Sequence, residues 1–233
     1  MGNLFEDRDL RNRSYVFKDR AEAGSLLAQK LFPSIPPDAL ILAIPAGGVP
    51  VALEISRKIN LHLDLMIVRK VQIPGNTEAG FGAVGPDGEV IFNQDLLKRL
   101  RLTKEEIDEE VRKTQKIVEA RNRMFRNGRI FPEVIDRPAI LVDDGLASGF
   151  TMAEAVRFLE RRRAKKIIIA VPTAPKQTVK RLLPVVDDIY VLNIRTSFAF
   201  AVAEAYKNWY DLGDEEVISL LKEAGIENRN LKN

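Results

Sequence analysis

The chain has 233 residues, of which 45% are hydrophobic and 30% charged, a composition typical of a globular protein with one large domain or two small ones. It has no cysteine and a single histidine, His62, which excludes disulfides, cysteine nucleophiles, thiolate zinc sites and multi-histidine metal sites. The net charge of +3 suits an anionic small-molecule partner and does not require nucleic acid.

The first part of the chain predicts a polar arm followed by a helix. Residues 1–16 include acidic side chains and lack the apolar core of a secretory signal. No apolar stretch reaches the length of a membrane span, so we expect a cytoplasmic protein without a membrane partner. Apolar residues recur at helical spacing over 19–31, and a cluster of prolines ends the predicted helix.

Two strands with a helix between them are predicted next. The short apolar runs 40–44 and 63–68 are typical of strands buried on both faces of a sheet. The helix is predicted over 49–59. We expect the second strand to end in Arg69 and Lys70, which would place two cations at its tip.

Residues 71–94 are rich in Gly, Pro and Asn and contain two strand-like pieces, 81–84 and 89–92, around a Pro-Asp-Gly turn. We expect a β-hairpin or a flexible lid here, because long loops in compact domains are usually functional or mobile. Thr103 then opens a capping-box pattern, so a long helix is predicted within a helical insertion over 95–130.

The second half of the chain alternates between predicted strands and helices. Strands are predicted at 139–142, 166–171 and 189–194, helices at 151–163 and 176–183, and helical segments at 201–209 and 214–224. The alternation predicts an α/β fold, a Rossmann-like parallel sheet flanked by helices, with a C-terminal helical hood. No internal repeat or linker divides the chain, so we expect a single domain over 1–233.

The segment 139–151 combines a buried strand, an acidic pair and a turn of small residues that opens a helix. The strand delivers Asp143 and Asp144 to its carboxyl end, where open α/β sheets bind ligands. The turn can hold a phosphate, because a helix N-terminus offers unpaired backbone N–H groups and hydroxyl side chains add donors. The loop consists of Gly145, Leu146, Ala147, Ser148, Gly149, Phe150 and Thr151. An acidic pair that merely caps a turn is the simpler alternative.

Segment 139–151 resembles the motif with which type I phosphoribosyltransferases bind 5-phosphoribosyl-1-pyrophosphate (PRPP): four apolar residues, two acids and a small-residue phosphate loop. The resemblance, to a largely uncharacterised prokaryotic group of that family, extends to the segments that begin at Phe17, Gly47 and Val68, to the long charged helix and to the tail 206–217. It implies the fold of the family. It also implies that Asp143 and Asp144 contact the ribose hydroxyls while loop 145–151 holds the 5′-phosphate.

The resemblance further implies a pyrophosphate site. The turn Ala46-Gly47-Gly48 follows the first buried strand and can direct backbone N–H groups towards an anion; an ordinary strand-to-helix turn is the alternative. Many relatives carry Arg before the glycine pair, so Ala46 leaves one cationic contact absent. Arg69 and Lys70 are predicted to neutralise the pyrophosphate, with a solvated basic pair as the alternative.

The implied reaction transfers the phosphoribosyl group of PRPP to an acceptor, here a nitrogenous base, and releases pyrophosphate. Asp143, Asp144 and Lys70 are the expected catalytic residues, since no pattern indicates a covalent nucleophile. Mg²⁺ is the expected cofactor, held mainly by PRPP near the two aspartates. Candidates for stacking on the acceptor, for which core packing is the more ordinary role, are Phe198, Phe200, Tyr206, Trp209 and Tyr210.

Other interpretations stay open. A regulator could bind PRPP or a nucleotide on the same fold without catalysis; a phosphate-binding hydrolase or kinase is weaker, because no P-loop or second acidic cluster is present. Nucleic acid is not favoured as a partner, because the basic residues of the insertion alternate with acidic ones, as on a solvated helical face or at a subunit contact. These basic residues are Lys98, Arg99, Arg101, Arg121, Arg123, Arg126 and Arg129. Formation of a homodimer also stays open.

Overall fold

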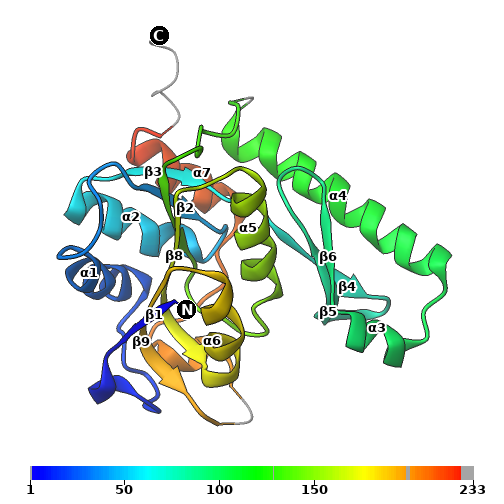
Figure 1. Cartoon of the computed structure of the whole chain (residues 1–233), viewed down its shortest axis with the longest axis horizontal. Helices are drawn as coiled ribbons and strands as arrows, with labels where there is room; N and C mark the ends of the chain where they lie inside the picture. The colour runs from blue at the N-terminus through cyan, green and yellow to red at the C-terminus, as the bar shows by residue number, and fades with distance from the viewer. Residues whose placement is uncertain (1, 128, 198–199, 227–233) are drawn as a thin grey trace.

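A six-stranded parallel β-sheet forms the centre of the protein. The computed structural model describes residues 2–127, 129–197 and 200–226. The strands lie in the order β1-β9-β8-β7-β2-β3 (Figure 1), and every pairing between neighbours is parallel. Their bounds are Asn3–Glu6 for β1, Leu40–Ala43 for β2, His62–Leu65 for β3, Pro138–Val142 for β7, Lys166–Pro175 for β8 and Asp188–Arg195 for β9.

Helices cover both faces of this sheet, which explains the uninterrupted apolar runs of its central strands. Alternate side chains of β2 face two different apolar cores, and all of them are buried. Helices α1 (Arg20–Leu31) and α2 (Gly48–Ile59) pack into the first core, and α5 (Phe150–Arg161) and α6 (Lys176–Leu182) into the second (Figure 1). The predicted α/β architecture is therefore confirmed.

The chain changes its direction of winding between β2 and β7. From β2 it passes through α2 to the edge strand β3, whereas from β7 it passes through α5 to β8 on the other side. The two strands are direct neighbours, in a register that pairs Ala43 with Val142. Loops that leave such neighbours diverge, and the crevice between them at the carboxyl end of the sheet is where ligands bind in open α/β folds.

A second, antiparallel sheet lies beside the main one, together with the long helix (Figure 1). Its elements are β4 (Arg69–Ile73), β5 (Asn76–Val84) and β6 (Val90–Phe92), followed by α3 (Gln94–Leu100) and α4 (Lys104–Arg126). The capping box at the start of α4 is present, since Thr103 and Glu106 each bond the backbone of the other. Helix α4 is therefore the long helix predicted within the insertion, and it begins directly after the predicted capping residue.

The segment 71–94 forms the predicted hairpin, and most of it is packed. Phe81 and Val84 are fully buried, and the turn is joined to α5, because Asp87 accepts two hydrogen bonds from Nη2 of Arg161, the shorter at 2.9 Å. Mobility of the segment stays a prediction. It applies best to the turn between β4 and β5, where Pro74 and Gly75 are exposed.

Two predictions about the first half of the chain are wrong. Residues 1–16 are not a polar arm, because β1 pairs with β9 and closes one edge of the main sheet. A short 3-10 helix, Arg8–Leu10, follows it. Arg69 and Lys70 do not end a strand of the parallel sheet. The strand ends at Leu65, and the two cations begin β4 of the second sheet.

The C-terminal part is less helical than predicted. Within the predicted helix 201–209 only Val202–Ala205 forms a short 3-10 helix. The predicted helix near 214–224 is present as α7 (Asp214–Glu223), and it packs against α2. None of the helices in the described ranges is long and apolar enough to cross a membrane.

Candidate functional site

Two adjacent carboxylates lie where β7 meets the crevice. Asp143 and Asp144 follow the last residue of the strand, and the backbone N–H of Asp144 donates to Oδ1 of Asp143 at 2.8 Å. The loop after β2 approaches so closely that a Cβ atom added at Gly47 would lie 2.0 Å from Oδ2 of Asp144. Only glycine leaves room for this contact. The acidic pair and the glycine turn, 96 residues apart in the chain (143 − 47), therefore meet in space.

Burial raises the pKa of both carboxyl groups, because an ionised carboxylate loses hydration there. At Asp143 the negative charge of Asp144 raises the pKa further. At Asp144 the guanidinium of Arg20 opposes the rise. A hydroxyl donor or a cation placed against Asp143 would offset the unfavourable burial of its charge.

Arg20, the first residue of α1, fixes one side of Asp144. Its Nε donates to Oδ2 of Asp144 at 2.8 Å, and its Nη1 donates to the carbonyl of Tyr210 at 2.9 Å. Its guanidinium carbon lies 4.0 Å from the ring centre of Trp209, within cation–π range. Only 7% of the Arg20 side chain is exposed. The Tyr206 hydroxyl also holds this residue, because it donates to the Asp144 carbonyl at 2.5 Å.

Sequence reasoning assigned no role to Arg20, although a signal for it exists. The residue stands at helical spacing before Ala23 and Leu27, and all three side chains lie on the buried face of α1. A charged residue on an apolar helical face needs a buried partner. The partner, Asp144, is 124 residues away in the chain, so the sequence alone could not identify it.

The loop 145–151 runs from the acidic pair into α5. Ala147 and Ser148 are exposed, and Gly149 has a φ of +74°, a conformation in which other residues are strained. Leu146 has a different role from its neighbours: its side chain is buried, and its N–H donates to a carbonyl of β8 at 2.9 Å. It therefore anchors the loop. Gly145 is buried, and the remaining two loop residues form the first turn of α5.

A cleft of about 300 Å³ opens between the crevice and the second sheet. It is lined by Ile44, Pro45, Val68, Arg69, Lys70, Gln72, Arg121, Asp143 and Thr151. Thus Asp143, Thr151 of the loop and the basic pair of β4 share one cavity, although the basic pair belongs to another sheet. An additional cation, Arg121, enters this cavity from α4.

The two cations of β4 are held differently. A Cβ atom added at Gly80 of β5 would lie 2.2 Å from Cγ of Lys70, so the lysine stem lies directly over this glycine. Burial lowers the pKa of Arg69, the positive charge of Arg121 lowers it further, and Asp214 opposes the change. The predicted glycine turn packs against the protein. Ala46 is half-buried against the apolar core, and a Cβ atom added at Gly48 would lie 2.6 Å from the Val142 carbonyl oxygen.

A second hollow, of about 570 Å³, includes Ala147 and Ser148 of the loop. Four cationic residues and one aromatic residue also line it: Lys176, Lys180, Arg181, Arg195 and Phe200. The other aromatic candidates have different positions. Tyr206 is buried, and its ring centre lies 5.6 Å from that of Phe17, whereas Trp209 stacks on Arg20, Tyr210 is 54% exposed and Phe198 lies outside the described residues.

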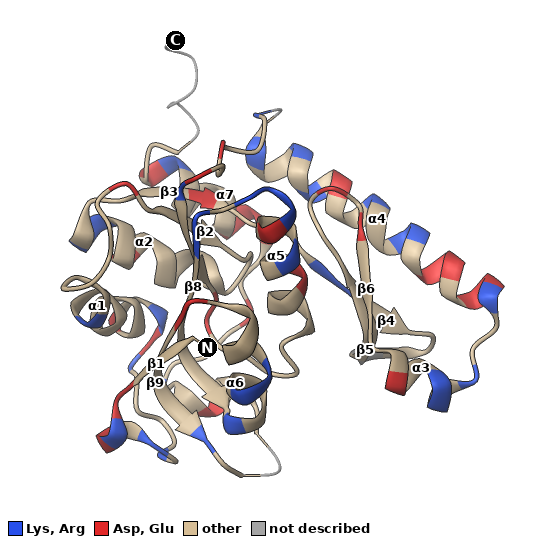
Figure 2. Ribbon diagram, viewed as in Figure 1, with Lys and Arg blue, Asp and Glu red and all other residues tan. Residues whose placement is uncertain are grey.

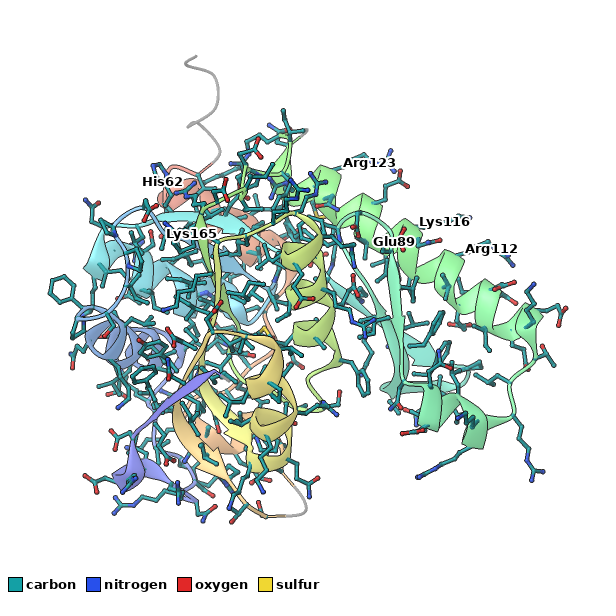
Figure 3. The ribbon with its side chains drawn as sticks, in the orientation of Figure 1. His62, Glu89, Arg112, Lys116, Arg123 and Lys165 are labelled. Carbon is teal, nitrogen blue, oxygen red and sulfur yellow. The ribbon has the colours of Figure 1, made fainter. Side chains whose placement is uncertain are left out.

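The sequence pattern predicted that the basic residues of the insertion lie on a solvated helical face, but only some of them do. Acidic and basic side chains alternate along α4 (Figure 2), and Arg123 is exposed near its C-terminal end (Figure 3). Arg126, however, is 3% exposed and forms a buried ion pair with Asp64 at 2.6 Å. Arg129 donates to the Ile226 carbonyl at 2.7 Å, and Arg121 lines the cleft. Lys98, Arg99 and Arg101 are exposed.

The chain resembles a known protein family, curated proteins and solved structures, and these matches agree with one another. A family model described as "Phosphoribosyl transferase domain" matches residues 20–209. Two curated proteins from strains of Mycobacterium tuberculosis, both named "Putative phosphoribosyl transferase", are 35% identical over 209 residues, which are 90% of this chain and 47% of theirs. The chain thus spans about half the length of the curated relatives it matches. The crystal structure of TT1426 from Thermus thermophilus shares 33% identity and a TM-score of 0.73, over 89% of this chain and 98% of that one.

Proposed function

The chain belongs to the phosphoribosyl transferase domain family, and from this membership we propose that it transfers the phosphoribosyl group of PRPP to a nitrogenous base and releases pyrophosphate. The observation that carries the proposal is the shared cleft of Asp143, Thr151 and Lys70, at the point where the sheet changes its winding. PRPP is a sugar with a phosphate at one end and a pyrophosphate at the other, so its binding needs hydrogen-bond acceptors for the sugar hydroxyls and donors or cations for the phosphates.

Each part of PRPP has a proposed partner. Asp143 and Asp144 accept hydrogen bonds from the ribose hydroxyls, and Arg20 keeps Asp144 in position. The exposed residues Ala147 and Ser148, just before α5, receive the 5′-phosphate, because small residues let an anion approach the backbone N–H groups. Arg69 and Lys70 neutralise the pyrophosphate.

The proposed reaction needs no covalent enzyme intermediate. The bond between the anomeric carbon and pyrophosphate breaks, and its electron pair leaves with the pyrophosphate oxygen. A nitrogen lone pair of the acceptor forms the new bond, and the acceptor releases a proton. Positive charge develops on the sugar ring in the transition state, where the carboxylates of Asp143 and Asp144 stabilise it. Lys70 stabilises the opposite charge on the leaving group.

The acidic pair also fits Mg²⁺, which prefers oxygen ligands and retains several waters. In the described ranges no group of three or more His, Cys, Asp or Glu side chains could hold a metal ion alone. We therefore propose that phosphate oxygens of PRPP hold most of the coordination sphere, with Asp143 and Asp144 beside it. When bound, Mg²⁺ would neutralise charge on the pyrophosphate.

The test measures pyrophosphate release from PRPP with Mg²⁺ and a panel of bases. Asp143→Asn and Asp144→Asn should each lower PRPP use by about tenfold or more, since both changes preserve side-chain size and remove the charge. Asp108→Asn, at an exposed position of α4, is the control and should behave as the unmodified protein.

A direct binding titration with PRPP separates the enzyme from a regulator on the same fold. Tight binding of PRPP without pyrophosphate release, with every acceptor in the panel, would favour the regulator. Undiminished turnover in the Asp143→Asn, Asp144→Asn double variant would show that the acidic pair has only a structural role.

A further inference from the structure

The insertion contributes a residue to the cleft that Asp143, Thr151 and the basic pair of β4 line. Arg121 lies in α4, outside the main sheet, and it lines the same cavity as Lys70 and Asp143. Its side chain is 21% exposed, compared with 74% for Arg123 on the same helix. Two arginines of one helix therefore differ sharply in environment, and only the first one faces the cleft.

Arg121 is held in place from two directions. Its Nη2 donates to Oδ1 of Asp214, at the start of α7, at 2.8 Å. The C-terminal end of α4 is fixed to the main sheet by the buried ion pair between Arg126 and Asp64. The helix thus cannot slide without breaking a buried charge pair, and the guanidinium of Arg121 is presented from a fixed backbone.

Two guanidinium groups of the cleft lie close to one another. Arg69 comes from β4 and Arg121 from α4, and both line the cavity. Arg69 and Arg121 both interact with Asp214, so a single carboxylate serves two guanidinium groups. Burial lowers the pKa of Arg69, and repulsion by the positive charge of Arg121 lowers it further. A multivalent anion between them would relieve this repulsion.

We propose that Arg121 binds the pyrophosphate of PRPP and supplies a positive charge to this site from the insertion. This inference rests on the proposed function. It makes the insertion part of the active site, because the residue that completes the pyrophosphate site belongs to α4. A guanidinium suits this role, since its planar donors can bond two phosphate oxygens at once.

The test compares two ligands that share only part of PRPP. Magnesium pyrophosphate probes the proposed contact, and ribose 5-phosphate probes the other end of the site. For Arg121→Gln we expect the affinity for pyrophosphate, measured by calorimetry, to fall by about ten- to a hundredfold, the value of a charge-assisted hydrogen bond. The affinity for ribose 5-phosphate should stay within about twofold, and Arg121→Lys should restore part of the loss.

Two control variants separate binding from support of the fold. Arg123→Gln removes an exposed arginine of the same helix and should change neither affinity. Asp214→Asn breaks the same ion pair but keeps the Arg121 guanidinium, so its effect on pyrophosphate binding should be much smaller. Equal losses from Asp214→Asn and Arg121→Gln would show that the ion pair matters only for the packing of α4, and would overturn the inference.

The remaining outcomes are also decisive. Unmodified protein that binds both ligands, with no selective loss of pyrophosphate binding in Arg121→Gln, overturns the inference and leaves the proposed function intact. Unmodified protein that binds neither ligand overturns the proposed function, and the inference with it.

Discussion

Replacing Arg20 with methionine should destabilise the protein strongly, because it leaves the Asp144 carboxylate buried without its cation. Methionine keeps an unbranched stem of similar length, so the change removes mainly the charge. The side chains of Arg20 and Asp144 are 7% and 13% exposed, and their atoms are 2.8 Å apart, so solvent screens the pair weakly. Breaking such a pair typically costs 3–5 kcal/mol, and we expect about 3 kcal/mol because Asp144 borders the crevice.

A loss of that size can be measured by thermal and denaturant unfolding. For a chain of this length, about 3 kcal/mol corresponds to a decrease in Tm of roughly 6–12 °C. The double variant Arg20→Met, Asp144→Asn should recover much of the loss, since no charge is then left without a partner. The expected coupling energy between the two positions is about 2 kcal/mol.

The exposed ion pair between Arg57 and Glu54, on α2, provides a matched control. Its atoms are 3.1 Å apart, but 54% of the Arg57 side chain is exposed, so Arg57→Met should change stability by less than about 0.5 kcal/mol. If Arg20→Met costs as little as Arg57→Met, or if its effect simply adds to that of Asp144→Asn, Arg20 is not the structural partner of the acidic pair.

Three further predictions follow from the crevice and the hairpin. Burial raises the pKa of Asp143 on folding, so its ionisation opposes folding. Asp143→Asn should therefore raise the Tm near pH 7, and the gain should shrink as the pH falls towards about 4; a pH-independent gain would argue against this cause. Gly47→Ala should lower PRPP turnover by about a hundredfold, because the new Cβ displaces the Asp144 carboxylate; unchanged turnover would show that the contact is dispensable. Arg161→Ala should speed amide hydrogen exchange in the turn around Asp87 by about tenfold or more while β7 stays protected, and equal exchange in both proteins would contradict the proposed docking of the turn.

Local sequence signals predicted those features of the fold that depend on neighbouring residues. The strand, acidic pair and loop of segment 139–151 are contiguous, so their arrangement at a strand end followed from the sequence. The same holds for α4, since Thr103 and Glu106 form its capping box within one turn. Such features need no knowledge of the rest of the chain.

The features that the sequence did not reveal depend on distant partners. β1 has few apolar residues and is recognisable as a strand only through its pairing with β9. Met66, Ile67 and Val68 are buried as strand residues would be, so hydrophobicity alone could not show that the chain leaves the parallel sheet at Leu65. Arg126 follows Phe125 on the buried side of α4, but its partner, Asp64, is 62 residues away in the chain.

The pairing of β1 with β9 also constrains the order in which the protein can fold. Asn3 bonds Asp188 across a sequence separation of 185 residues, so this edge of the sheet is closed by the longest chain loop among the strand pairs. Contacts of that kind bring their stabilisation only after the entropy of closing the loop has been lost, and they form late. Until β9 is in place, the first strand has no partner along the main sheet, and the backbone edge of β9 in turn stays open to pairing with other chains until β1 arrives.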